Sequence, residues 1–285
     1  ARLGAQFSYR EAVREVEHHL GIFTSDKTIQ RYTNKIGELA SSIPVRDLLL
    51  SKNKSPVVTV QIDGGRVRVK GGWRETKTLI IENGSDKIQF TMIADHKTFM
   101  EKVKEIVCKY GYDQYQGKIC LISDGAIWIG DDFAEIFPHI EQVLDYYHFK
   151  EHLYDTAKIL FGENNQVQIK KFVDTACTLT FEDNIDILLN SLEAIRDSYT
   201  EGSSNYESLR KLYSYLHKNR FRIRYGIFRE HGLPIGSGKV EATIKTMNNI
   251  RLKSASTIWD EFNVQKVINL RTLIANNQWR ELQCA

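Results

Sequence analysis

The stretch that decides the fold is Val57–Val69, which reads VVTVQIDGGRVRV. Its first six residues are apolar or β-branched apart from Gln61, and this composition predicts a buried strand. Asp63-Gly64-Gly65 interrupts the run, and we expect the strand to break there before Arg66–Val69 continues it. A carboxylate within an apolar strand is costly unless it is paired or binds a metal, so Asp63 is a candidate functional residue.

The residues that follow predict an alternation of strands and helices. We expect strands at 76–81, 87–93, 118–123 and 142–147, and helices at 97–110 and 131–137. Asn83-Gly84, after the first of these strands, is a strong hairpin signal. The order β-β-β-α-β-α-β predicts a mixed sheet with helices on its faces. This is the ribonuclease-H-like arrangement, an α/β fold in which the first and fourth strands lie side by side at the centre of the sheet.

Short helices precede this α/β region. Tyr9–Leu20 has apolar residues at helical spacing, and Ser25-Asp26 can cap a second helix from Lys27 to about residue 39. The two helices could form a helix-turn-helix that presents Lys27 and Arg31 to a DNA groove. A plain helical hairpin packed on the core is the alternative.

Helical patterns alone occupy residues 148–232, which predicts an all-α insertion in the α/β fold. The predicted domains are therefore a helical segment at 1–45, a catalytic domain formed by 55–147 with 233–285, and the insertion at 148–232. The chain begins at Ala1 rather than at Met, and we expect a trimmed chain or a fragment.

Charge is distributed unevenly along the chain. Residues 205–255 contain eleven Lys and Arg and three acids, a net charge of +8, whereas the whole chain carries only +3. A basic block of this kind is typical of a surface that binds a polyanion, although a solvated surface would carry the same charges. The four cysteines include no close pair, which disfavours a zinc or disulfide framework and suits a reducing cytoplasm. We find neither a signal-peptide pattern nor an apolar run long enough for a bilayer, so we expect no membrane partner.

Three acids form a candidate metal site. Asp63 and Asp124 each lie in or just after an apolar strand and are each followed by Gly. If the two strands are adjacent, their carboxylates would repel one another unless a cation lay between them. Each Asp-Gly could instead be a simple turn. Glu241 would supply a third carboxylate from a helix that begins after Gly236-Ser237-Gly238.

These acids lie in motifs that resemble a known family. VQIDGGRV at 60–67, LISDGA at 121–126 and GSGKVEAT at 236–243 are similar to the three acidic motifs of DDE insertion-sequence transposases. The resemblance is to the ISKra-type group, with ISLre-type and Mutator-like enzymes as relatives, and it extends from about Phe7 to Trp279. Such enzymes usually carry more DNA-binding sequence upstream of the helices seen here.

The resemblance implies a role for each acid. Asp63, Asp124 and Glu241 would hold two Mg²⁺ ions, which Mn²⁺ could replace, for cleavage and transfer of DNA strands. Asp145 and His148 match the Asp-x-x-His element of many relatives, in which the His orients a metal ligand or touches DNA. An all-helical insertion between the second Asp and the Glu is also a feature of such relatives.

The expected partner is double-stranded DNA, both transposon ends and target, and two active sites acting on paired ends would suit a homodimer. Such an enzyme would work in the bacterial cytoplasm, associated with the nucleoid. Trp259 could stack on an unpaired base, although a core position is the alternative. The remaining DNA contacts are expected from the helix that carries Glu241 and from the first strand: Arg66, Lys239, Lys245, Asn248, Arg251 and Lys253.

Three alternatives remain. A structure-specific nuclease of the same fold would share the three acids. His148, Glu151 and His152 match the H-x-x-E-H pattern of inverted zinc peptidases, which place both His residues on one helix face. A non-enzymatic DNA-binding protein would explain the basic block but not the acids in the strands. Dependence on Mg²⁺ or Mn²⁺ separates the nucleic-acid enzymes from the regulator, and zinc content separates the peptidase.

Overall fold

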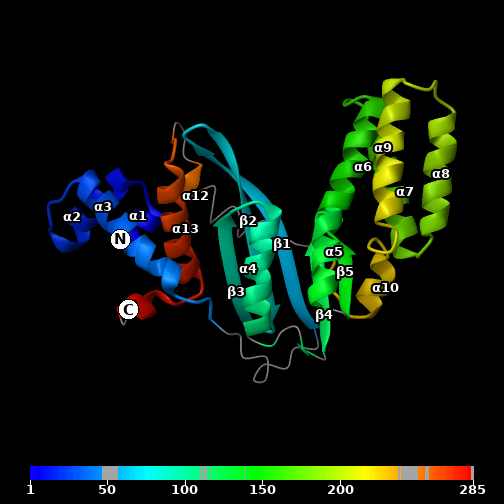
Figure 1. The fold of residues 1–285 in the computed structure, drawn as a ribbon. Coiled ribbons are helices and arrows are strands. Elements are labelled where there is room, and N and C mark those ends of the chain that lie inside the picture. Colours follow the sequence, from blue (N-terminus) through cyan, green and yellow to red (C-terminus); the bar gives the residue numbers. More distant parts are fainter. Residues whose placement is uncertain are drawn as a thin grey trace. The chain divides into compact units, whose positions relative to one another are not determined.

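The computed structural model describes residues 1–46, 57–109, 111, 114–115, 117–137, 139–236, 238, 250–253 and 257–283. The chain forms two compact units (Figure 1). Unit 1 comprises residues 1–117 together with 238–285, and unit 2 comprises residues 118–237. The predicted order of three strands, a helix, a strand, a helix and a strand is confirmed along the chain, so the architecture is mixed α/β.

Unit 1 combines an antiparallel sheet with helices from both ends of the chain. Its elements are α1 Arg2–Gln6, α2 Tyr9–Leu20, α3 Asp26–Leu39, η1 Ala40–Ser42, β1 Val57–Val69, β2 Gly72–Asn83, β3 Asp86–Ile93, α4 His96–Lys109, α12 Ile250–Leu252, α13 Glu261–Ala275 and η4 Trp279–Gln283.

Strand β1 is continuous through Asp63, so the predicted break at Asp63-Gly64-Gly65 is wrong. Asp63 pairs with Thr78, Gly64 with Lys77 and Gly65 with Thr76, in one antiparallel register with β2. Backbone hydrogen bonding does not depend on the side chain, so two glycines can stay in the ladder when a neighbouring strand pairs with them. Strand β3 pairs with β2 through a turn at Gly84, where the hairpin was predicted.

The two faces of this sheet are covered differently. Helix α4 buries Phe99, Val103 and Val107, and Phe99 stacks on Phe90 of β3 with ring centroids 6.3 Å apart. These residues recur at helical spacing, which is why the helix was predicted from the sequence. On the other face, a core cluster combines the end of β1 with α12, α13 and Trp259, which lies between the two helices. Its members are Val67, Val69, Leu252, Trp259, Val264, Val267 and Ile268.

Side chains from other elements bond to the backbone of β3 along the edge that faces away from β2. The Gln89 N–H donates to Asn276 Oδ1, and Asn276 Nδ2 donates to the Gln89 carbonyl, both at 2.9 Å. The Ile93 N–H donates to Gln265 Oε1 at 2.8 Å, and Arg46 Nη2 donates to the Lys87 carbonyl at 3.3 Å. Helix α13 therefore runs along β3 and takes the place of a neighbouring strand.

The N-terminal helices α1 and α3 pack on α13. Helix α3 contacts α13, and Lys266 Nζ lies 3.0 Å from Glu38 Oε2. Arg271 Nη1 donates to the Ala5 carbonyl at the end of α1. Helices α2 and α3 themselves match the prediction, with Ser8 and Ser25 as N-caps.

Unit 2 begins with a parallel pair of strands and continues as helices. Its elements are β4 Lys118–Ser123, α5 Ile127–Ile136, β5 Ile140–Leu144, α6 Tyr146–Phe161, α7 Gln166–Phe181, α8 Ile185–Asp197, α9 Ser204–Lys218 and α10 Tyr225–Glu230. Helices α6 to α9 each contact their sequence neighbours, and α6 also contacts α9, so the four form a closed bundle (Figure 1). Residues 148–232 are mainly helical, as predicted, and they belong to the same compact unit as β4 and β5.

The last predicted strand ends earlier than expected. Strand β5 stops at Leu144, and α6 starts at Tyr146, whereas a strand had been predicted to 147. The Asp145 side chain accepts hydrogen bonds from the Tyr147 and His148 amides, and this N-cap turns the aromatic residues into the first turn of a helix.

None of the helices in the described ranges combines the length and apolar character needed to cross a bilayer.

We predict that Asn276→Ala lowers the free energy of unfolding by about 1–3 kcal/mol, because it leaves buried backbone groups of Gln89 without partners. Urea denaturation provides the measurement, and amide exchange at Gln89 should also be faster. Asn277→Gly is the matched control, since Asn277 is exposed and its φ of +59° suits glycine. Equal stabilities for the two variants would contradict this account of the β3 edge.

Candidate functional site

Asp124 is the first residue after strand β4. Its Oδ1 accepts a hydrogen bond from the Ala126 N–H at 3.0 Å, which closes a tight turn. Gly125 within this turn has φ +85°, a conformation that residues with a side chain rarely adopt. A Cβ at Gly125 would also lie 2.6 Å from Leu144 Cδ1. The Asp-Gly pair therefore sets the exit from β4, and the carboxylate is half-buried there.

Asp145 occupies the corresponding position after strand β5. Ser123 and Leu144 are register partners in the parallel pair, so Asp124 and Asp145 follow at neighbouring positions of the same sheet edge. The Asp145 N–H donates to the Ser123 carbonyl at 2.8 Å, and Asp145 itself is fully buried. Its Oδ1 accepts from the Tyr147 and His148 amides at 2.6 and 3.2 Å. The edge thus carries two carboxylates, one half-buried and one buried.

Tyr215 of helix α9 closes this edge, and nothing in the local sequence identifies it. Its hydroxyl donates to the Asp124 carbonyl at 2.9 Å. Burial raises the pKa of Tyr215, and the charges of Asp124 and Asp145 raise it further. The hydroxyl therefore keeps its proton at neutral pH and remains a donor.

Helix α6 presents the predicted His148 at its first turn. Its Nδ1 lies 3.2 Å from Glu151 Oε2, and the side chain is partly exposed. One turn later, the His152 ring packs on the Tyr215 ring with centroids 4.1 Å apart. Desolvation and the neighbouring His148 lower the pKa of His152. The H-x-x-E-H residues thus share one helix, but no third ligand joins them in the part of the chain described here.

Asp63 lies in unit 1, half-buried in the middle of β1. Its Oδ1 accepts from the Gly64 N–H at 2.6 Å. Across the strands it shares a row with Thr78 and Thr91, whose buried hydroxyls are 3.0 Å apart. This face of the sheet is therefore polar around the carboxylate.

The third predicted acid, Glu241, lies outside the described residues, as do Lys239, Lys245 and Asn248. Within the described ranges, no group of three or more His, Cys, Asp or Glu side chains is arranged to hold a metal ion. Asp63 and Asp124 offer carboxylate oxygens, which are the donors that Mg²⁺ and Mn²⁺ prefer, so the chemistry of these two residues fits the predicted cofactor.

Comparisons with known proteins assign no family. No protein-family model matches the chain, and no curated protein is similar enough to match it. Weak similarity exists to a solved structure of NurA with manganese, at 13% identity over 87% of this chain and 82% of that chain, with a TM-score of 0.15. A second NurA structure is 11% identical over 91% of this chain and 63% of that chain, with a TM-score of 0.16. A structure of NurA bound to dAMP and manganese is 12% identical over 96% of this chain and 65% of that chain, with a TM-score of 0.14. TM-scores this low do not show a shared fold, and they indicate nothing about function.

Arg251 and Trp259 are corrections to the predicted DNA contacts, because both are buried in unit 1. The Arg251 guanidinium lies over two rings that contact each other edge to face, 4.7 Å from the centroid of Tyr9 and 4.6 Å from that of Trp259. Its Nε donates to the Gly4 carbonyl at 3.1 Å, and Trp259 Nε1 donates to the Leu252 carbonyl. A cation–π contact and the core hold these side chains where neither a phosphate nor a base reaches them.

Other predicted DNA contacts are exposed. Lys27 and Arg31 lie on the exposed side of α3, and Arg66 and Lys253 are also exposed. All four remain predictions.

Part of the basic block is neutralised within unit 2. Arg224 forms two hydrogen bonds with Asp183 at 2.7 and 2.6 Å, and Arg210 bonds to Glu207. Glu207 is already counted in the net charge of residues 205–255, but Asp183 lies outside that segment. Its pairing with Arg224 therefore leaves less positive charge for a polyanion than the net charge of the segment indicates.

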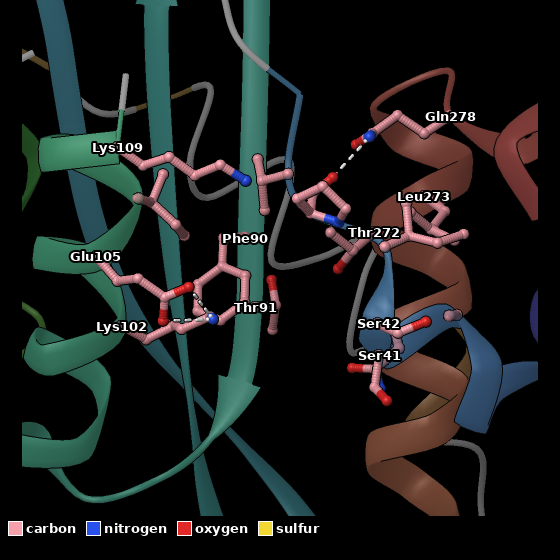
Figure 2. A pocket seen from close by; sticks show the side chains of 16 residues that line it. Ser41, Ser42, Phe90, Thr91, Lys102, Glu105, Lys109, Thr272, Leu273 and Gln278 are labelled. Atoms are coloured by element: carbon pink, nitrogen blue, oxygen red, sulfur yellow. Dashed lines mark hydrogen bonds and ion pairs between the residues drawn. The ribbon is translucent and has the colours of Figure 1, made fainter. Parts of the chain in front are cut away.

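A cavity of about 330 Å³ lies in unit 1 beside β3, between α4, η1 and α13 (Figure 2). Figure 2 shows Lys102 paired with Glu105 on one wall and Gln278 on the other. Gln278 Nε2 donates to the Pro44 carbonyl at 2.8 Å. Phe90 and Thr91 lie between these walls. Asp63 does not line this cavity, so the cavity is separate from the predicted metal ligand that lies in the described part of unit 1.

We predict that Gly125→Ala destabilises unit 2 more than Gly202→Ala does. Both glycines have positive φ, +85° and +81°, so each substitution should cost about 1–2 kcal/mol of backbone strain. Only position 125 adds crowding, because nothing lies within 4 Å of a Cβ at Gly202. Thermal unfolding of the two variants measures the difference, and equal losses would contradict the tight turn after β4.

We predict that the imidazole of His152 titrates below the ordinary value of 6.5. As pH falls, the unfolded chain then takes up this proton before the folded protein does, so stability decreases from about pH 6.5 down through the folded pKa. An NMR titration of the ring measures the value, and Tyr215→Ala should move it upwards by returning water to the ring. A His152 pKa at or above 6.5 in the unsubstituted protein would contradict this packing.

Proposed function

We propose that this protein is a DDE-type DNA transposase of the kind its motifs resemble, in which Asp63, Asp124 and Glu241 bind divalent metal. It would cleave DNA at transposon ends and join the released ends to target DNA. The proposal includes the finer fold, a ribonuclease-H-like sheet in which β1 and β4 are adjacent.

The observation that carries the proposal is the arrangement at the ends of β4 and β5. Asp124 follows a buried strand, and it is next to a glycine with positive φ rather than in an exposed loop. Asp145 and His148 follow the neighbouring strand in the order that the family motif has. Two neighbouring strand ends that each carry a carboxylate, with a histidine beside them, are more typical of a metal-dependent active site than of a purely structural turn.

The strand order along the chain gives a second line of support. Three antiparallel strands, a helix and a parallel pair separated by a helix occur in the order expected for a ribonuclease-H-like domain. Asp63 lies on the first of these strands and Asp124 directly follows the fourth, as the motif resemblance requires.

The proposed chemistry is phosphoryl transfer in two steps. Water attacks a phosphodiester at the transposon end, and the bond to the 3′-oxygen breaks to leave a 3′-hydroxyl. That hydroxyl then attacks a phosphodiester of target DNA and displaces its 3′-oxygen. Mg²⁺, when bound, lowers the pKa of the attacking group and neutralises charge on the phosphate. Exposed Lys27, Arg31, Arg66 and Lys253 would hold the DNA backbone.

A structure-specific nuclease is the second candidate, since it would use the same acids for the first step alone. Joined products distinguish the two, because a nuclease releases cut DNA without linking it to a second duplex.

We predict that Asp63→Asn, Asp124→Asn and Glu241→Gln each abolish Mg²⁺-dependent cleavage of DNA that carries transposon ends. Binding of that DNA should stay intact or become tighter, because a negative charge is removed near the phosphates. Gel analysis of cleaved and joined products gives the activity, and a mobility-shift assay gives the binding.

Asp186→Asn is the control variant, since Asp186 is an exposed acid in the first turn of α8. It should keep full activity. Undiminished cleavage by Asp63→Asn or Asp124→Asn would overturn the proposed function, and cleavage without joining would favour the nuclease.

A further inference from the structure

We infer that Tyr215 is a positioning residue for Asp124, and that the helical segment α9–α10 holds the ends of β4 and β5 in place. The inference rests on the proposed function in so far as it makes Asp124 a metal ligand. All of the residues that carry it lie within unit 2.

The turn after β4 is fixed from two sides. The Ala126 N–H bonds to the Asp124 carboxylate from within the turn, and the Tyr215 hydroxyl bonds to the Asp124 carbonyl from helix α9. Around Gly125, a Cβ would lie 3.1 Å from the Tyr215 hydroxyl and 3.3 Å from Asn219 Nδ2. Helix α9 therefore packs directly on the Asp-Gly backbone, and Asp124 cannot move without disturbing it.

The end of β5 is held by the next part of the same segment. The Leu144 N–H donates to the Arg222 carbonyl at 2.9 Å, and the Tyr225 hydroxyl donates to the Leu144 carbonyl at 3.1 Å. Tyr146, two residues after Leu144, donates its N–H to the Ile235 carbonyl at 2.9 Å. Residues 222–235 thus bond to the backbone on both sides of Asp145.

Helix α5, which follows the turn after β4, is held by the same segment. A side chain at Gly130 would occupy the position of the Arg222 guanidinium, so that arginine lies directly over the helix backbone. Arg222 Nη1 also donates to Asn219 Oδ1 at 3.4 Å. One short segment, from Tyr215 to Tyr225, therefore contacts β4, α5 and β5.

This arrangement gives the helical segment a chemical role. A ligand held in its binding geometry before the metal arrives loses less freedom on binding, and partners behind a ligand strengthen metal affinity. The Tyr215 hydroxyl acts on the backbone of Asp124 and leaves its second carboxylate oxygen to other partners. Removal of this hydroxyl should therefore weaken metal binding without removing a metal ligand.

The test compares Tyr215→Phe with Tyr213→Phe, a matched loss of one hydroxyl from the same helix. Calorimetric titration with Mn²⁺ should show affinity lower by on the order of tenfold in Tyr215→Phe and unchanged in Tyr213→Phe. The Mg²⁺ concentration for half-maximal cleavage should rise by the same factor, with DNA affinity unchanged. Amide exchange at Ala126 should be faster in Tyr215→Phe alone, and thermal melting shows that both variants are folded.

The outcomes separate the two proposals. Unchanged Mn²⁺ affinity and unchanged exchange at Ala126 in Tyr215→Phe would overturn the positioning role, whatever the activity. Faster exchange with unchanged Mn²⁺ affinity would also overturn it, because the hydroxyl would then be merely structural. An unsubstituted protein that binds Mn²⁺ through Asp124 but cleaves no DNA would overturn the proposed function and leave the positioning role standing.

Discussion

The carboxylate of Asp145 makes the contact on which the rest of unit 2 depends. Its two hydrogen bonds to the amides of Tyr147 and His148 end strand β5 and begin helix α6 within one residue. Helix α6 is the first helix of the four-helix bundle, so the direction of this N-cap sets where the bundle starts. A buried carboxylate needs such partners, because burial without them would cost several kcal/mol.

The same constraint links the helices of unit 2 to the strands that precede them. Parallel strands that stop side by side leave backbone groups at their ends, and in β5 these groups are bonded by residues that follow α9. The chain must therefore return from the bundle to the strands before it leaves unit 2. The ends of the strands, the Asp145 carboxylate that caps α6 and the segment that follows α9 each depend on the others. Such agreement between local and long-range interactions favours a single fold.

The order of the strands and helices could be predicted from sequence because each depends on local periodicity. Val57–Ile62 is a local run of apolar and β-branched residues, and Phe99–Val107 has apolar residues at a period of 3.6, whatever the rest of the chain does. The break at Gly64 was predicted wrongly because glycine signals a turn locally, whereas pairing with β2 is a tertiary effect. The end of β5 was misplaced for a similar reason, since Tyr146-Tyr147 has strand character until Asp145 caps it.

The candidate site was only partly accessible to such reasoning. Asp63 and Asp124 stand out because acids in apolar strands are unusual, but Tyr215 lies 91 residues from Asp124 and has no distinguishing neighbours in sequence. Arg251 was misassigned because a basic residue near a motif suggests DNA. Two of its actual partners, Gly4 and Tyr9, are more than 240 residues away. A sequence shows where a residue type is unusual for its local segment, such as an acid in an apolar strand. It does not show which residues are buried by segments far away in the chain.

The side chains along β3 have a consequence for association between copies of the chain. Arg46, Gln265 and Asn276 already occupy backbone groups of Lys87, Gln89 and Ile93. A second molecule that approached this side of the sheet would have to displace them before it could add a strand. Edge-to-edge pairing of strands from neighbouring molecules, a usual route to fibrous aggregates, is therefore resisted there by amides and a guanidinium instead of by repelling charges.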